Sequence, residues 1–153
     1  MKRLILFLLL LCLAGCGSEA YNNRGIAYNE KGEHEKAITD FTEAIRLNPN
    51  DAAAYNNRGI AYAQKSESEK AIADYTEAIR LNPNDAKVYY NRGIAYDEKG
   101  EYEKAIADYT EAIRLNPNYA LAYENRGNAY QKIGEKTKAD ADFAKAKELG
   151  YKS

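Results

Sequence analysis

Small and apolar residues recur along most of this chain at the three- and four-residue spacing of helices, and short polar turns interrupt them at regular intervals. The first such block predicts one helix over about residues 19–31 and a second over about residues 35–47. Gly32 lies between them, and glycine tolerates the positive φ that ends a helix and allows a tight turn. The segment Asn48-Pro49-Asn50-Asp51 then ends the second helix, because proline cannot continue a helix and Asn or Asp can cap the next one.

This pair of helices returns every 34 residues, so the chain from residue 18 onward reads as four copies: 18–51, 52–85, 86–119 and 120–153. The second and third copies are identical at 26 of 34 positions. Ser66 takes the place of the turn glycine in the second copy, which predicts a less comfortable turn there. One helical pair cannot bury its apolar face alone, so about three stacked copies are needed for stability.

The repeat resembles the tetratricopeptide repeat family, whose pattern is an aromatic residue, then Gly and Tyr in the first helix, then Ala, an aromatic residue and Ala in the second, then Pro. The residues that match it in the first copy are Tyr21, Gly25, Tyr28, Ala37, Phe41, Ala44 and Pro49. The resemblance implies an all-α fold, a right-handed superhelical solenoid of eight helices. Small Gly25 and Ala37 should let the two helices of a pair approach closely, while Phe41 fills the space between them.

The fourth copy differs from the others where a last copy should differ. The Ile38, Ile72 and Ile106 column becomes Asp140, and the Ile45, Ile79 and Ile113 column becomes Lys147. Ala139, Phe143 and Ala146 keep the contacts within the pair. This combination predicts a polar end cap, at which the solenoid ends and head-to-tail stacking is disfavoured.

In solenoids of this family the first helix of each pair lines a concave groove, and the resemblance therefore implies a binding surface for a peptide. The candidate groove residues are Asn23, Ile26, Asn56, Asn57, Ile60, Lys87, Tyr90, Asn91, Ile94, Asn125 and Asn128. A column of asparagines can pair with both N–H and C=O of an extended peptide. The alternative is that these asparagines cap or brace neighbouring helices. The isoleucine column and Tyr90 would add apolar contacts, or serve only the packing between repeats.

A column of arginines, one per copy, could suggest an anion site. The arginines are Arg24, Arg58, Arg92 and Arg126, and they recur together with Asp40, Asp74, Asp108 and Asp142. A structural Arg–Asp pair between helices is therefore the preferred interpretation. Some family members clamp a terminal carboxylate with several Lys, Arg and Asn residues, but only Asn57 and Lys87 fit that pattern here, so chaperone-tail binding of that type is not expected.

The first sixteen residues differ in kind. Lys2 and Arg3 precede an apolar run, residues 4–14, which as a helix would span roughly 16 Å, too short for a hydrocarbon core ~30 Å thick. This pattern is typical of a cleaved secretory signal. Leu13-Ala14-Gly15-Cys16 resembles the lipobox of bacterial lipoproteins, which implies removal of residues 1–15 and lipidation of Cys16, leaving 16–17 as the lipidated N-terminus. The alternative is an ordinary signal peptide with an incidental cysteine.

That resemblance also implies a location. Gly17 follows the cysteine, where an aspartate tends to retain lipoproteins in the inner membrane. We therefore expect a protein of the bacterial cell envelope, lipid-anchored to the outer membrane and facing the periplasm. Two or more acyl chains make a durable anchor, whereas one chain would be marginal.

Composition narrows the function further. Charged residues make up 29% and hydrophobic residues 45% of the 153 residues, which excludes a disordered tail and a polytopic membrane protein. The formal net charge is −1, with no long run of like charges, so no nucleic-acid partner is expected. His34 is the only histidine, and no metal cluster, phosphate-binding glycine loop or nucleophile–base pair is present in the sequence.

We therefore expect no enzyme, no metal, no cofactor and no small-molecule substrate. The sequence favours a membrane-anchored scaffold that binds an extended or helical segment of a partner protein in the groove. Two alternatives stay open: a structural subunit of an envelope secretion, pilus or outer-membrane machine that uses the convex face, and a self-associating homo-oligomer.

Overall fold

The computed structural model describes residues 17–151, which form eight helical segments and no strand. Residues 17–30 form the first helical segment. The helices that follow are α2 (His34–Leu47), α3 (Ala52–Gln64), α4 (Ser68–Leu81), α5 (Ala86–Glu98), α6 (Tyr102–Leu115), α7 (Ala120–Lys132) and α8 (Lys136–Glu148). The predicted all-α solenoid of helical pairs is confirmed, and the two predicted helices of the first copy differ from the observed ones by one or two residues at their ends.

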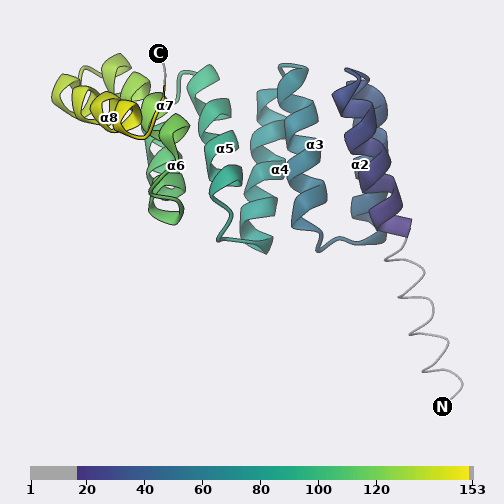
Figure 1. Ribbon diagram of the computed structural model, residues 1–153. Helices are drawn as coiled ribbons and strands as arrows, with labels where there is room; N and C mark the ends of the chain where they lie inside the picture. Colours follow the sequence, from purple (N-terminus) through teal and green to yellow (C-terminus); the bar gives the residue numbers. More distant parts are fainter. Residues whose placement is uncertain (1–16, 152–153) are drawn as a thin grey trace, which may run out of the picture.

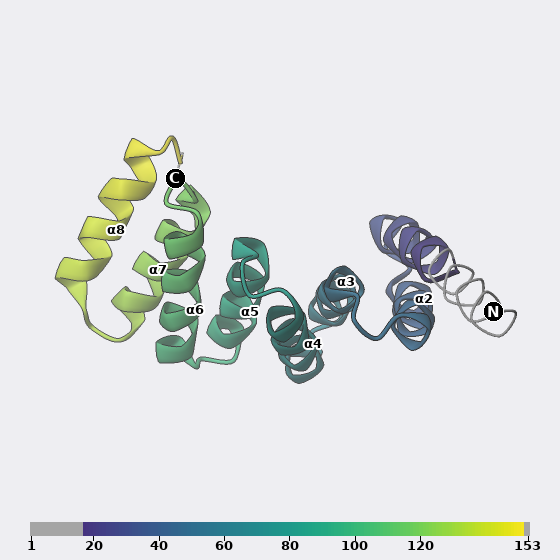
Figure 2. The same ribbon diagram turned by 90° about the horizontal axis from the view of Figure 1, so that it is seen from below.

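The helical pairs stack side by side along one axis (Figure 1). Seen from below, the stack follows a curved path, with 17–30, α3, α5 and α7 along its concave side and the second helix of each pair along its convex side (Figure 2). The helices α2, α4 and α6 each contact the first helix of the next pair, and hydrophobic clusters join neighbouring repeats, so the core runs continuously through the solenoid. The concave face therefore belongs to the first helix of every repeat, as the resemblance implied.

Each pair is held at close range by a glycine that faces an aromatic ring. Gly25, Gly59, Gly93 and Gly127 face Phe41, Tyr75, Tyr109 and Phe143. A Cβ atom built on Gly93 would lie 2.7 Å from the Tyr109 ring, closer than any real carbon contact. The predicted role of the small residue in the first helix is confirmed, because only hydrogen at this position leaves room for the ring of the second helix.

The arginine column is structural, as predicted. Arg92 on α5 donates from Nε and Nη2 to both carboxylate oxygens of Asp108 on α6, each at 2.8 Å. Its Nη1 also donates to Thr76 Oγ1 on α4, at 3.1 Å. Arg58 and Arg126 repeat the arrangement with their own Asp and Thr partners. One guanidinium thus joins the two helices of its own repeat to the second helix of the preceding one.

The turns explain where the helices begin. Asp51 accepts hydrogen bonds from the backbone N–H groups of Ala53 and Ala54, and Asp85 accepts one from Lys87, so these two residues cap α3 and α5 as predicted. Tyr119 stands at the corresponding position before α7 and provides no side-chain cap. In the fourth repeat Asp140 and Lys147 are exposed, as a polar end face requires.

Ser66 adopts φ 60°, the left-handed conformation that its position in the turn between α3 and α4 demands. Gly32, Gly100 and Gly134 adopt it at the equivalent positions at no steric cost. The free energy of unfolding of a Ser66→Gly variant is therefore expected to be about 1 kcal/mol higher than that of the parent, so the variant should unfold at a higher urea concentration. The matched reverse change, Gly100→Ser, should lower the stability by a similar amount; equal midpoints for both variants and the parent would contradict this explanation.

Candidate functional site

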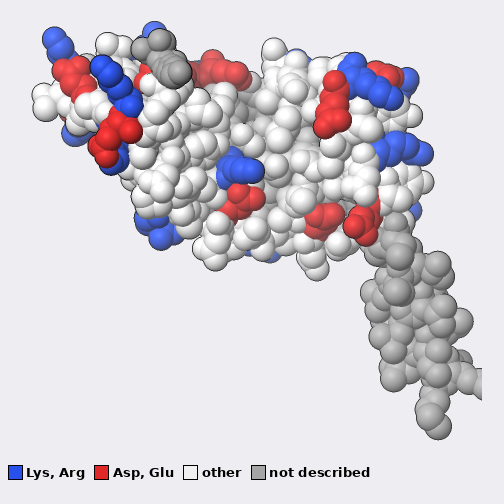
Figure 3. All heavy atoms as spheres, viewed as in Figure 1, with Lys and Arg blue, Asp and Glu red and all other residues white. Residues whose placement is uncertain are grey.

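The concave face presents few charges to a partner. The surface seen in Figure 3 is mostly uncharged over its middle part, where one basic and one acidic cluster lie next to each other. Ile26 on the first helical segment is 37% exposed on this face, which is high for an isoleucine.

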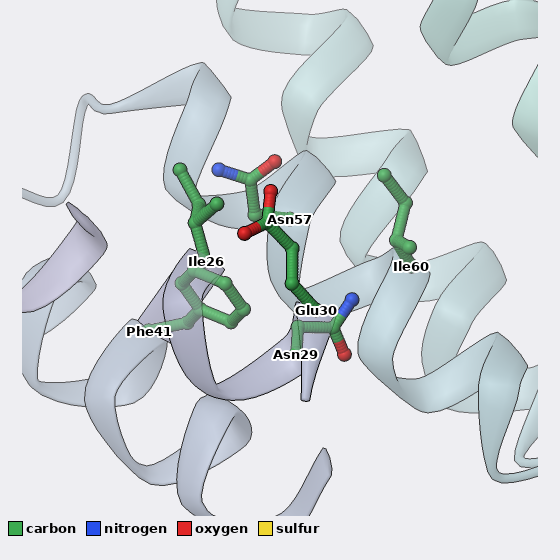
Figure 4. A pocket seen from close by; sticks show the side chains of 6 residues that line it. All are labelled: Ile26, Asn29, Glu30, Phe41, Asn57 and Ile60. Carbon is green, nitrogen blue, oxygen red and sulfur yellow. The ribbon is translucent and has the colours of Figure 1, made fainter. Parts of the chain in front are cut away.

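A first cavity of about 210 Å³ lies between the first helical segment and α3. It is lined by Ile26, Asn29, Glu30, Phe41, Asn57 and Ile60 (Figure 4). Two isoleucines stand on its opposite walls, and the Phe41 ring reaches it from the second helix of the pair. The ring takes this position because Gly25 has no side chain to fill the space.

A second cavity of about 300 Å³ repeats this design one repeat further along, between α3 and α5. It is lined by Ile60, Ala63, Gln64, Tyr75, Asn91, Ile94, Ala95 and Glu98. Ile60 is common to both cavities and forms the ridge between them. Burial raises the pKa of the Tyr75 hydroxyl, which like any tyrosine hydroxyl is protonated at neutral pH and can donate a hydrogen bond.

The isoleucine column serves two purposes. Ile60 and Ile94 are partly buried and pack against the core clusters of their repeats, which is the packing role that the sequence left open. The same side chains line the cavities, together with Ile26. The groove surface is therefore continuous with the core, so an apolar ligand side chain would extend the packing of the repeats.

The asparagine column braces neighbouring helices, as the alternative interpretation held. Nδ2 of Asn57 donates to Asn22 at 3.1 Å, and Nδ2 of Asn91 donates to Asn56 at 3.2 Å. Nδ2 of Asn125 donates to the Tyr90 hydroxyl at 3.0 Å. Each bond uses one N–H of the amide and joins the first helices of consecutive repeats. Within residues 17–151, the Oδ1 atoms of Asn57 and Asn91 accept no hydrogen bond, so each still offers an acceptor at a cavity.

The other predicted groove residues lie outside the two cavities. Asn23 lines a separate polar hollow beside the loop that joins α2 and α3. Lys87 and Asn128 are exposed and line neither cavity. Tyr90 packs its ring against Tyr109 and Tyr119, with centroids 5.9 and 4.8 Å away, and so contributes to the packing between the third and fourth repeats.

Eight residues that line the cavities are not among the predicted groove residues: Asn29, Glu30, Phe41, Ala63, Gln64, Tyr75, Ala95 and Glu98. Of these, Phe41 had been assigned only to packing. The sequence does contain a signal for the aromatic rings of Phe41 and Tyr75, because each follows a helical glycine by sixteen residues. That glycine has no side chain, so the ring can extend past it to the groove. Glu30, Gln64 and Glu98 share one column, which the helical period assigns to the concave face, but that period does not show how far a groove extends.

The electrostatics of the cavities are acidic. Glu30 lines the first cavity and Glu98 the second, and neither cavity is lined by Lys or Arg. Asp97 precedes Glu98, and burial raises the pKa of its carboxyl group against the opposing effect of Lys132. Asp97 lines neither cavity, so the acidic character of the cavities comes from Glu30 and Glu98.

Between residues 17 and 151 no group of three or more His, Cys, Asp or Glu side chains is placed to hold a metal ion. None of the helices in that part is both long and apolar enough to cross a membrane.

Comparison with protein families gives consistent matches. The model described as "Tetratricopeptide repeat" matches residues 52–85 and 86–119, a second model of that description matches 108–141, and one described as "TPR repeat" matches 25–66. Together these matches run from the first repeat into the fourth. No curated protein matches the chain significantly.

Several solved structures are similar to this one. A crystal structure of MamA is 33% identical, with a TM-score of 0.84, over 86% of this chain and 77% of that one. The Arabidopsis OM64 TPR domain is 30% identical, with a TM-score of 0.75, over 77% of this chain and 98% of that one. The first TPR of Spaghetti (RPAP3) bound to the HSP90 peptide SRMEEVD is 25% identical, with a TM-score of 0.77, over 78% of this chain and 95% of that one.

Proposed function

Because this chain belongs to the tetratricopeptide repeat family, we propose that it is a non-catalytic scaffold that binds a segment of a partner protein in its concave groove. The observation that carries the proposal is the pair of cavities that share Ile60. At about 210 and 300 Å³, each is at or below the low end of the size range for small-molecule sites. Such cavities suit single side chains of a polypeptide laid across the first helices.

The similar RPAP3 domain was solved with a peptide, SRMEEVD, that has three acidic residues and one basic residue. The comparison supports peptide binding by this fold. The carboxylates of Glu30 and Glu98 at the two cavities favour a different ligand in this chain, because an acidic peptide would meet like charge there. This repulsion gives a physical reason to expect that the groove does not bind an acidic chaperone tail by a carboxylate clamp.

A groove variant can be made with a residue that the chain itself carries at the same column. Asn128 replaces isoleucine in the fourth repeat, so Ile26→Asn combined with Ile60→Asn should keep the helices, as circular dichroism can check, at some cost to the core packing of Ile60. The double variant removes the apolar walls of the first cavity. Immobilised 17–153 protein is expected to retain a specific partner from a membrane extract, and the double variant should lose at least nine-tenths of it, about 1.4 kcal/mol of binding free energy.

The matched control is Ala73→Asn combined with Ala107→Asn, which places the same side chain at exposed positions of α4 and α6 on the convex side. This variant should retain the partner. Loss of the partner only in the control would favour the convex-face alternative, an envelope structural subunit. If the molecular mass of the parent in solution rises with protein concentration, and either variant has a lower mass at the same concentration, the homo-oligomer would be favoured.

The proposal includes a membrane anchor at Cys16, which lies outside the described residues. Leu13-Ala14-Gly15-Cys16 supports it, and so does the start of the fold directly after the cysteine. Ser18 is 2% exposed and donates from Oγ to the Ala44 backbone oxygen at 3.0 Å. A lipid on Cys16 would therefore be attached to a packed helix with almost no linker, so the scaffold would lie against a membrane of the bacterial envelope. Gly17 after the cysteine favours the outer membrane.

This attachment predicts a fixed orientation. The chain has no tryptophan, so single tryptophans can report distance to labelled lipid headgroups by energy transfer. Asn50 shares a hollow with Ser18, whereas Lys31 lies beyond the far end of the first helical segment, about 20 Å away. In the lipidated protein Asn50→Trp should transfer energy more efficiently than Lys31→Trp, and Cys16→Ser should abolish transfer from both. Equal transfer from the two positions would show that the anchor is flexible.

A further inference from the structure

The first helical segment leaves exposed a face that every later first helix buries. In α3, α5 and α7 this face has an arginine, with a small or apolar residue four positions before it and another three positions after it. These flanking residues are at most 3% exposed: Ala54, Ala61, Val88, Ala95, Ala122 and Ala129. The same three positions in residues 17–30 are Ala20, Arg24 and Ala27, and all of them are exposed. We call these three residues the end face, because their helix lies at one end of the stack (Figure 1).

Three interfaces inside the chain show which kind of helix covers such a face. The helices α2, α4 and α6 each pack against the first helix of the next repeat. In α4, Ile72 and Ile79 pack against the core cluster that contains Val88 of α5. Between them, Thr76 accepts the hydrogen bond from Nη1 of Arg92. The three α4 residues lie at i, i+4 and i+7 on one side of the helix, and α2 and α6 carry isoleucine, threonine and isoleucine at the same positions.

Arg24 has the same hydrogen-bonding groups as its counterparts, but one of them is unused. It donates from Nε and Nη2 to the carboxylate of Asp40. Its Nη1 donates no hydrogen bond within the described residues, whereas Nη1 of Arg58 donates to Thr42. The Arg24 side chain is 57% exposed, compared with 17% for Arg58, and it borders a hollow of about 510 Å³. The end face therefore offers a donor between two small residues, which fits a hydroxyl oxygen flanked by apolar side chains.

No helix of the described chain suits this face when a second copy supplies it. The apolar sides of α2, α4 and α6 are already packed against the next repeat. In α8 the two isoleucine positions are Asp140 and Lys147, and the threonine position is Ala144. Two end faces paired by a twofold axis would bring two Arg24 side chains together, and like charges disfavour that contact. The complementary helix therefore has to come from a different protein.

From the exposed end face, the unused donor and the three internal interfaces, we infer that the end face binds an amphipathic helix of a partner protein. That helix presents apolar residues at positions i and i+7 and a serine or threonine at i+4. It packs on Ala20 and Ala27 and accepts a hydrogen bond from Arg24, so the partner continues the solenoid by one helix. None of these three residues lines either cavity, and the inference does not rest on the proposed groove function.

The test uses the full chain in mild detergent and a fluorescent peptide with the sequence of α4, Ser68–Leu81. A covalent bridge between two side chains on the polar side of the peptide keeps it helical, because an isolated helix of this length is marginal in water. The matched control peptide carries Ile72→Asp and Ile79→Lys, the residue types that α8 has at these positions. Fluorescence anisotropy should show that the α4 peptide binds at least tenfold more tightly than the control peptide.

Two variants of the protein locate the binding site. Ala20→Gln combined with Ala27→Gln should weaken binding of the α4 peptide at least tenfold, because the larger side chains hold the helix away from the end face. Both alanines are exposed and glutamine is a good helix former, so this variant should keep its helicity. Ile26→Asn changes the first cavity and should leave the affinity for the α4 peptide unchanged.

Equal binding of the two peptides, or equal binding by the parent and the glutamine variant, would overturn the inference. The absence of saturable binding at about 1 mM peptide would do the same. If Ile26→Asn abolished binding and the glutamine variant did not, the peptide would occupy the groove and not the end face. A parent that forms dimers in sedimentation, together with a glutamine variant that stays monomeric, would show that a second copy covers the face instead.

Discussion

An Asp108→Ala variant is expected to lose about 3 kcal/mol of its free energy of unfolding. Asp108 is 5% exposed and accepts two hydrogen bonds from Arg92, whose side chain is 17% exposed. Truncation would leave a guanidinium that is largely removed from water without its counter-charge. We expect the lower end of the usual 3–5 kcal/mol for breaking a buried ion pair, since Arg92 keeps its bond to Thr76 and some contact with solvent. Urea unfolding followed by helical circular dichroism measures the change.

The chain contains two matched controls for this prediction. Glu111 pairs with Arg114 on the same helix, but in an exposed pair, so Glu111→Ala should change the midpoint little. Asp40 pairs with Arg24, which is 57% exposed because no repeat within the described residues precedes it. Asp40→Ala should therefore cost less than Asp108→Ala. Equal losses in all three variants would mean that burial of the guanidinium is not the cause.

The sequence was sufficient to predict those contacts that recur within one repeat. Arginine and aspartate return together sixteen residues apart, and the ion pair between them follows because each lies on a facing side of a helical pair. Gly93 and Tyr109 are also sixteen apart and meet for the same reason. A 34-residue period with these columns leaves little freedom in how the two helices of a repeat pack.

Contacts between repeats were harder to predict from the sequence. The asparagine column was a candidate peptide ladder, and the structure shows that Asn91 donates to Asn56, a residue thirty-five positions earlier on the preceding first helix. Helical periodicity assigns both residues to the concave side, but it does not give the distance between consecutive first helices. The cavities depend on that same distance, which is why their isoleucines were predicted and the rings of Phe41 and Tyr75 were not.

Departures from the repeat show how the groove changes along its length. Tyr90 stands where the earlier repeats have asparagine, and its hydroxyl accepts the bond from Asn125 that an amide oxygen accepts elsewhere. Tyr119 has replaced a capping aspartate and stacks on Tyr90 instead. Aromatic packing therefore tightens the last interface, while the two cavities lie in the first three repeats, so a ligand should bind nearer the N-terminal end.

A Tyr109→Ala variant is expected to lose about 3–5 kcal/mol, the largest effect of any single substitution proposed for this chain. Tyr109 is 1% exposed and fills the gap that Gly93 leaves between α5 and α6, so alanine would create a cavity that the helices cannot close without shifting. In a solenoid each repeat contacts only its neighbours, so the loss falls on the third repeat and on both of its interfaces. The fourth repeat should then open independently, and its amide protons in α7 and α8 should exchange faster with solvent than those of α3 and α4.

Tyr109→Phe is the control that the chain itself supplies, because Phe41 and Phe143 occupy the same column in the first and last repeats. The ring, and with it nearly all of the buried area, is kept, so this variant should lie within about 1 kcal/mol of the parent. If Tyr109→Phe were as unstable as Tyr109→Ala, the hydroxyl would be the stabilising group. If both variants kept the protection of α7 and α8, the fourth repeat would not depend on the packing of the third, and the continuous core would be an incorrect description of this solenoid.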